Sequence, residues 1–145
     1  MIAKAFSLLE LIIVILIIAI ISYFLVPKLQ DVFLKTHLTQ LKSNVAIIQN
    51  NISKLKSKEI LLLSDFKIDK LDDARVNIKD EKLFTKVIDF DILSTDNETK
   101  ELGKWIKTSA LSYEYFLASN QRVLFEIENN IFICKSNIEI CKEIE

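Results

Sequence analysis

The sequence predicts an α+β fold in which a long N-terminal helix, half membrane-spanning and half amphipathic, packs on a small C-terminal antiparallel β-meander. Three observations support this prediction. Every residue from Leu11 to Ile21 is apolar. Between Leu34 and Leu55 apolar residues recur at the helical spacing of three and four. After Trp105, short apolar-rich segments alternate with polar turns. A chain of 145 residues is long enough for one anchor and one small domain.

The apolar run has the length of a membrane span and contains one acidic residue. It extends from Phe6 to Val26, which at 1.5 Å per residue gives roughly 31 Å of helix, about the thickness of the hydrocarbon core. Glu10 is the only side chain in this run that is charged at neutral pH. Because a carboxylate inside a span costs free energy, its presence indicates a function and requires a partner.

The five residues before the run suggest what that partner is. Met1 to Ala5 carries one lysine and ends in the small-residue segment Ala3-Lys4-Ala5, whereas the residues after the run, Ser22 to Val26, are too bulky for a signal-peptidase site. Cleavage between Ala5 and Phe6 would leave the apolar segment attached and expose an α-amine that is cationic at neutral pH. We therefore expect Glu10 to pair with the amine of Phe6, in its own chain or in a neighbouring copy.

The segment Lys4 to Val14 resembles the prepilin signature of type IV pilins and type II secretion pseudopilins. That signature is a short basic leader, a small residue, Phe-Thr/Ser-Leu-x-Glu and about twenty apolar residues; here it reads Lys-Ala-Phe-Ser-Leu-Leu-Glu-Leu-Ile-Ile-Val. Ala5 stands where the family usually has Gly, and Pro27 stands where it usually places a helix-bending proline. The resemblance covers about residues 4–30.

The resemblance implies a processing and assembly pathway. A prepilin peptidase would cleave after Ala5 and N-methylate Phe6. Subunits would then leave the inner membrane, with the help of an assembly-platform protein, by stacking their apolar helices into a filament core. There the carboxylate of Glu10 would meet the amine of Phe6 on an adjacent copy or sister subunit. Because an unpaired charge in a dry core is costly, the pair would specify register.

Beyond the span, the sequence predicts that Pro27 bends the helix and that an amphipathic half continues to about residue 57. Its apolar stripe consists of Leu34, Leu38, Leu41, Val45, Ile48, Ile52 and Leu55. The stripe can pack on the chain's own domain or form a coiled-coil seam between subunits. Three heptads are close to the minimum for a coiled coil, so packing on the chain's own domain is favoured.

The remainder of the predicted exported domain, residues 28–145, contains a connector at about 58–104, a meander at about 105–135 and a charged tail from Ser136. In the connector we expect a short helix over Asp80–Ile88 and a turn at Asp96-Asn97-Glu98 before Gly103. Trp105 is expected in the core. Three antiparallel strands are expected at Tyr113–Leu117, Val123–Glu128 and Ile131–Cys134, the last two joined by an Asn129-Asn130 turn.

Candidate bonds and metal sites are few. Cys134 and Cys141 are the only cysteines, and an exported domain favours a disulfide between them over two free thiols; many pilins resemble this in having a disulfide-closed C-terminal loop. His37, the lone histidine, is expected on a solvated polar face, so no metal site is predicted. An acidic stretch could form a calcium loop, as in some pseudopilins, but it fails the EF-hand spacing and a solvated loop is favoured. Its residues are Asp89, Asp91, Asp96 and Glu98.

Composition and missing motifs narrow the function. A net charge of −1 shows no basic surplus for binding nucleic acid. The chain lacks a P-loop, a Gly-x-Ser-x-Gly motif and a histidine pair, so we expect neither an enzyme nor a cofactor or small-molecule ligand. The charges of Lys4 and the amino terminus place the leader, residues 1–5, in the cytoplasm, the span at 6–27 in the bacterial inner membrane and the domain in the periplasm or on a pilus.

The expected function is a pseudopilin or minor pilin of a type II secretion or competence (DNA-uptake) system. The compact domain, in a chain with a single glycine, supports this choice over the long variable loops of an adhesive surface. The alternatives are a major type IV pilin and, from another class, a monomeric single-pass anchored periplasmic binding protein.

Overall fold

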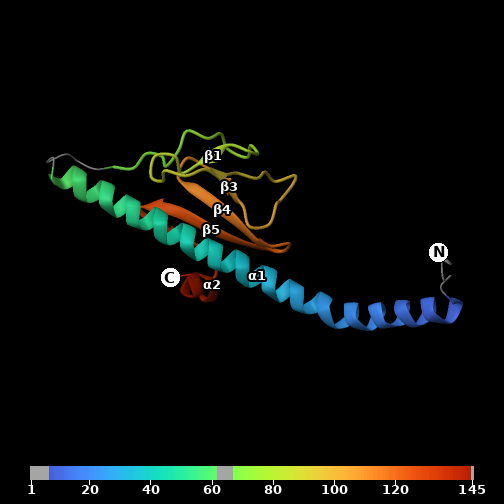
Figure 1. Cartoon of the computed structure of the whole chain (residues 1–145). Coiled ribbons are helices and arrows are strands. Elements are labelled where there is room, and N and C mark those ends of the chain that lie inside the picture. Colours follow the sequence, from blue (N-terminus) through green and yellow to red (C-terminus); the bar gives the residue numbers. More distant parts are fainter. Residues whose placement is uncertain (1–6, 62–66, 145) are drawn as a thin grey trace. The chain divides into compact units, whose positions relative to one another are not determined.

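The computed structural model describes residues 7–61 and 67–144. The chain divides into two compact units, residues 1–35 and 36–145, and each is described by itself. The element order is α1, β1 to β6 and α2. This is the predicted α+β fold, with one long N-terminal helix and a small C-terminal antiparallel sheet (Figure 1).

Helix α1 runs from Leu8 to Leu61 without interruption, so the predicted long helix is confirmed and continues four residues beyond the expected end at 57. The helix passes through Pro27 without a break in its backbone assignment. The bend that we expect at this proline stays a prediction. Its N-terminal half includes a window of mean hydropathy 3.0, long and apolar enough to cross a membrane.

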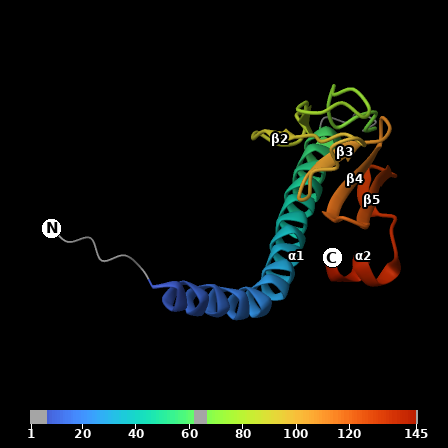
Figure 2. The ribbon, with the colours of Figure 1, turned by 90° about the vertical axis from the view of Figure 1, so that its right-hand side faces the viewer.

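The C-terminal half of α1 packs on its own domain, which confirms the favoured interpretation of the apolar stripe (Figure 2). Four stripe residues, Leu41, Val45, Ile48 and Ile52, are buried in the core of the second unit. Leu38 and Leu55 are partly buried and contact the same core. Leu34 departs from the expectation, because it remains 39% exposed.

The main sheet has four strands rather than the predicted three. They are β3 (Trp105–Lys107), β4 (Ser112–Ala118), β5 (Gln121–Glu128) and β6 (Ile131–Cys134), antiparallel and in chain order. Strand β3 was missed because it has only three residues, all buried, and so shows no alternation of apolar and polar positions. The predicted Asn turn is confirmed: φ is 52° at Asn129 and 61° at Asn130, as a two-residue hairpin of this type requires.

The predicted helix over Asp80–Ile88 is wrong. Lys82–Leu83 forms strand β1, which pairs with β2 (Ile92–Leu93). After β1 the backbone reverses at Phe84, whose φ is 60°, and the N–H groups of Val87 and Ile88 both donate to the Phe84 carbonyl. The apolar side chains at helical spacing are indeed buried, but a single turn buries them. The turn predicted at 96–98 is confirmed at residues 97–99.

An aromatic cluster fills the space between α1 and the sheet. The ring of Trp105 lies 5.1 Å from Tyr115, 5.3 Å from Phe125 and 6.1 Å from Phe132, measured between ring centroids. Phe84, brought in by the turn after β1, lies 5.3 Å from Trp105 and nearly perpendicular to it. Such edge-to-face contacts stabilise the core beyond the burial of apolar area. Trp105 is fully buried, as predicted.

The C-terminal tail, which was predicted only to be charged, contains a short helix. Helix α2 spans Ile138–Ile144, and Cys141 within it is bonded to Cys134 at the end of β6, with a Cα–Cα distance of 5.6 Å. The predicted disulfide is therefore present. Ile140 and Ile144, four residues apart, both contact the core, so the disulfide and one apolar helix face together attach the tail to the domain.

Candidate functional site

The N-terminal end of α1 is capped by its own sequence. Ser7 directly precedes the helix, and its Oγ accepts a hydrogen bond from the backbone N–H of Glu10 over 3.2 Å. The Ser7 carbonyl accepts the N–H of Leu11, also at 3.2 Å. Serine at the cap position followed three residues later by glutamate is the spacing of a capping box. This cap was not predicted above, although the Ser-x-x-Glu pattern before an apolar run signals it.

The capping geometry gives Glu10 a local role beside the predicted one. It lies in the first turn of α1, where the unpaired N–H groups and the helix dipole favour a negative charge. A carboxylate here would stabilise the helix by about 0.3–1 kcal/mol without any partner chain. Any test of an intermolecular role must therefore separate pairing with another chain from stabilisation of the helix end.

The residues predicted for processing lie outside the described part of the chain. Ala5 and Phe6, the cleavage position and the N-methylation position, belong to residues 1–6, so cleavage, methylation and the pairing of Glu10 with the Phe6 amine all stay predictions. Of the predicted pair, the structure describes only Glu10. Its side chain is exposed on the first turn of α1.

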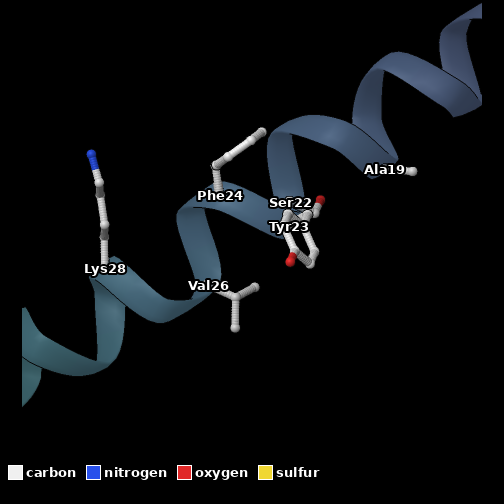
Figure 3. Close-up of a pocket in the computed structure, with 6 residues that line it drawn as sticks. All are labelled: Ala19, Ser22, Tyr23, Phe24, Val26 and Lys28. Carbon is white, nitrogen blue, oxygen red and sulfur yellow. The ribbon is translucent and has the colours of Figure 1, made fainter.

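The segment of α1 that follows Glu10 exposes apolar side chains around its whole circumference. The large apolar side chains from Leu8 to Val26 are 42–77% exposed, and the most hydropathic window of the helix is 0% buried. A shallow hollow near the end of this segment is lined by residues of α1 alone, namely Ala19, Ser22, Tyr23, Phe24, Val26 and Lys28 (Figure 3). Since one helix cannot enclose a ligand, this hollow belongs to a surface that lipid or another helix would cover.

The most connected polar site of the second unit is a buried ion pair that the sequence did not reveal. Lys107 Nζ lies 2.6 Å from Asp72 Oδ1, with both side chains at most 6% exposed. Asp72 Oδ2 also accepts the Tyr113 hydroxyl at 2.8 Å and the Phe84 N–H at 2.9 Å. Lys107 Nζ donates further to the Ala74 carbonyl at 2.9 Å. Each charge is therefore paired and hydrogen-bonded, as burial demands.

This cluster ties the connector to the sheet and offers no reactive group. Burial raises the pKa of the Tyr113 phenol far above its ordinary range, and the neighbouring Asp72 carboxylate raises it further, so the hydroxyl stays protonated and donates. The Lys107 ammonium and the Asp72 carboxylate neutralise each other. We interpret the cluster as the anchor that holds the irregular connector in place, since backbone ladders there are short.

The acidic stretch is used for turns and surface pairs. Asp96 Oδ1 accepts the N–H of Thr99 at 2.6 Å and its hydroxyl at 2.7 Å, and these bonds, the backbone one foremost, hold the pKa of Asp96 below its ordinary value. Asp91 pairs with Lys82 over 2.7 Å at the surface. Within residues 7–61 and 67–144, no three His, Cys, Asp or Glu side chains lie close enough together to hold a metal ion.

His37 is not the solvated side chain that we expected. It is half-buried, and its Nδ1 is enclosed without a hydrogen-bond partner in the described part of the chain. Its ring packs directly on Gly103, where an added Cβ would lie 2.7 Å from His37 Cε1. The His37 carbonyl accepts the Tyr115 hydroxyl over 3.1 Å. The helical pattern placed His37 correctly on α1, but the loop that covers it comes from distant sequence.

No protein-family model, curated protein or solved structure matches this chain.

Proposed function

We propose that this chain is a structural subunit of a type IV pilus-like filament, a pseudopilin or minor pilin of a type II secretion or competence system. The observation that carries the proposal is the arrangement at the start of α1: Glu10 lies on the first turn, the segment from Leu11 to Val26 has no other charged side chain, and the most hydropathic window of the helix is 0% buried.

The proposed pathway uses groups of this sequence in order. A prepilin peptidase cleaves between Ala5 and Phe6 and methylates the new amine. The precursor sits in the bacterial inner membrane with its leader in the cytoplasm and its domain in the periplasm. On assembly, the apolar side chains of α1 exchange lipid for neighbouring subunits. Glu10 then meets the Phe6 amine of an adjacent copy, because an unpaired charge in that dry core costs several kcal/mol.

The capping box makes a sharp test possible. Glu10→Gln removes the charge but keeps a side chain that suits the third position of a capping box. Ser7→Ala removes the cap, at a cost of about 1 kcal/mol of helix stability, but keeps the charge. If Glu10 pairs with an amine of another copy, Glu10→Gln should abolish filament assembly and Ser7→Ala should leave it largely intact, measured by recovery of filaments from the expressing cells.

The opposite ranking would refute the assembly role. Assembly that survives Glu10→Gln and fails in Ser7→Ala would mean that Glu10 only stabilises the helix end. A chain found by mass spectrometry to be intact from Met1, with Phe6 unmodified, would remove the processing step as well. If the chain is instead a monomeric membrane-anchored protein, it should tolerate Glu10→Val.

A major type IV pilin is the second candidate, and the Cys134–Cys141 disulfide favours it, because disulfide-closed C-terminal segments resemble those of many pilins. Abundance separates the two. A major pilin would dominate the fibres sheared from the cell surface, and a pseudopilin would be absent from them.

A further inference from the structure

The C-terminal end of α1 carries a face that its own domain leaves uncovered. A shallow hollow on this face is lined only by residues of α1, most of them polar: Asn50, Ser53, Lys54, Ser57, Lys58 and Leu61. Lys54 and Lys58 are exposed, and neither has a carboxylate partner among the described residues. Like charges four residues apart destabilise a helix slightly. The Leu61 side chain beside them is 83% exposed.

Helix α2 presents the opposite charge at the same spacing. Glu139 and Glu143 are exposed, and neither has a cationic partner in the described part of the chain. A carboxylate is favoured in the first turn of a helix and disfavoured in the last, so the helix dipole accounts for Glu139 but not for Glu143. Ile138, next to Glu139, is 67% exposed.

The two charged faces lie far apart within the second unit. Figures 1 and 2 both show α2 well away from the end of α1 at Leu61. The lysines of one face therefore cannot meet the glutamates of the other within one chain. A contact between copies would use a different surface on each partner, and contacts of this kind generate a ring or an open helical filament rather than a two-fold dimer.

We propose that the α1 face at Lys54 and Lys58 binds the α2 face at Glu139 and Glu143 of a second copy of this chain. The members of each pair are about 6 Å apart along their helix axis, so both ammonium groups can meet a carboxylate at once. The inference rests on the proposed function, because it specifies one contact between neighbouring subunits of the filament.

The apolar and small side chains of the two faces fit the same arrangement. With the two helices antiparallel, the exposed Leu61 side chain lies near the exposed Ile138 side chain while the charges pair. Ser53 and Ser57 leave the hollow into which α2 can pack. Because exposed ion pairs are individually weak, the contact would direct how the domains meet while the apolar segment of α1 supplies most of the affinity.

The first test is chemical cross-linking of filaments recovered from the expressing cells. A carbodiimide joins an amine directly to a carboxylate that touches it, and mass spectrometry of the digested filaments identifies the joined peptides. We expect a cross-link between residues 54–58 and residues 139–143. Since these segments are far apart in one chain, the cross-link would report a contact between copies.

Charge reversal is the second test. Lys54→Glu with Lys58→Glu should lower filament recovery by roughly tenfold, because an exposed ion pair contributes up to about fivefold to binding and two pairs become repulsive. Glu139→Lys with Glu143→Lys should have the same effect. The four substitutions together restore opposite charges in exchanged positions and should return recovery to within about threefold of the unchanged chain.

The matched control is Lys56→Glu with Lys67→Glu. It changes the net charge equally, but Lys56 lies on the side of α1 that borders β6 and Lys67 lies beyond the helix, so recovery should not fall. An equal loss in this control and in the Lys54 and Lys58 variant would refute the contact. If the fourfold variant is not rescued and no cross-link forms between copies, the face does not bind a second copy.

The test also separates this contact from the proposed function. Assembly that is lost in Glu10→Gln and kept in the Lys54 and Lys58 variant would retain the filament and overturn the contact. If the unchanged chain forms no filaments, the proposed function and this contact are both refuted.

Discussion

Breaking the buried ion pair between Asp72 and Lys107 should destabilise the domain far more than breaking any surface pair. Lys107→Met keeps the length of the side chain and removes its charge, leaving the Asp72 carboxylate with the hydroxyl of Tyr113 and the N–H groups of Phe84 and Ala74. Removing one partner of a buried pair costs about 3–5 kcal/mol. Because three donors remain on the carboxylate, we expect a loss near the lower end, about 3 kcal/mol.

Asp72→Asn should cost more, toward about 5 kcal/mol, because it leaves the Lys107 ammonium with only carbonyl oxygens as strong acceptors. The double variant should cost less than the sum of the singles, since neither charge is then stranded. The assay is urea unfolding of the full chain in micelles, followed by fluorescence of Trp105, the only tryptophan and fully buried.

The matched control is Lys82→Met, which breaks the exposed pair with Asp91. Those side chains are 59% and 57% exposed, so the loss should not exceed about 1 kcal/mol. The reasoning would be refuted by a Lys107→Met variant no less stable than this control, or by a double variant whose cost equals the sum of the two single costs.

Further predictions concern the loop, the tail and the acidic turn. Gly103→Ala should destabilise the domain by about 1–3 kcal/mol, since φ there is 76° and the new Cβ would meet the His37 ring; a second substitution, His37→Ala, should recover the steric part in the same unfolding assay. Reducing the Cys134–Cys141 bond should lower the free energy of unfolding by about 2–3 kcal/mol, compared in unfolding curves with and without reductant. The pKa of Asp96 is lowered in the folded chain, so its contribution is present above the unfolded pKa and is lost as pH falls through the folded pKa. Asp96→Asn should therefore destabilise at pH 7, and the difference from the unchanged chain should shrink on acidification; a pH-independent difference would contradict this assignment.

The parts of the fold that the sequence predicted are those controlled by local pattern. The apolar run and the 3–4 spacing of the stripe predict α1, because side chains three and four apart share one helix face. The strands Tyr113–Leu117, Val123–Glu128 and Ile131–Cys134 and the Asn129-Asn130 turn follow from alternation and from the tolerance of asparagine for positive φ. The disulfide follows from two cysteines in a domain expected to be exported.

The failures share a different cause. The spacing of Leu83, Phe84, Val87 and Ile88 correctly predicts that these side chains are buried. A turn buries them instead of a helix, and within this turn the Phe84 N–H donates to the distant Asp72 carboxylate. Strand β3 is too short for periodicity to appear. The cap that Ser7 Oγ provides for the Glu10 N–H could have been predicted from the Ser-x-x-Glu spacing.

By itself, the amino-acid sequence determined the apolar segment with its single acid, the face of α1 that enters the core, the hairpin and the cysteine pair, since each depends on residues close together in the chain. Only the tertiary structure decided that Lys107 neutralises Asp72, that Gly103 packs against His37 and that the Gln49 amide donates to the Phe132 carbonyl. Those outcomes join residues between 35 and 83 positions apart, and no local pattern specifies which distant side chain will be there to meet them.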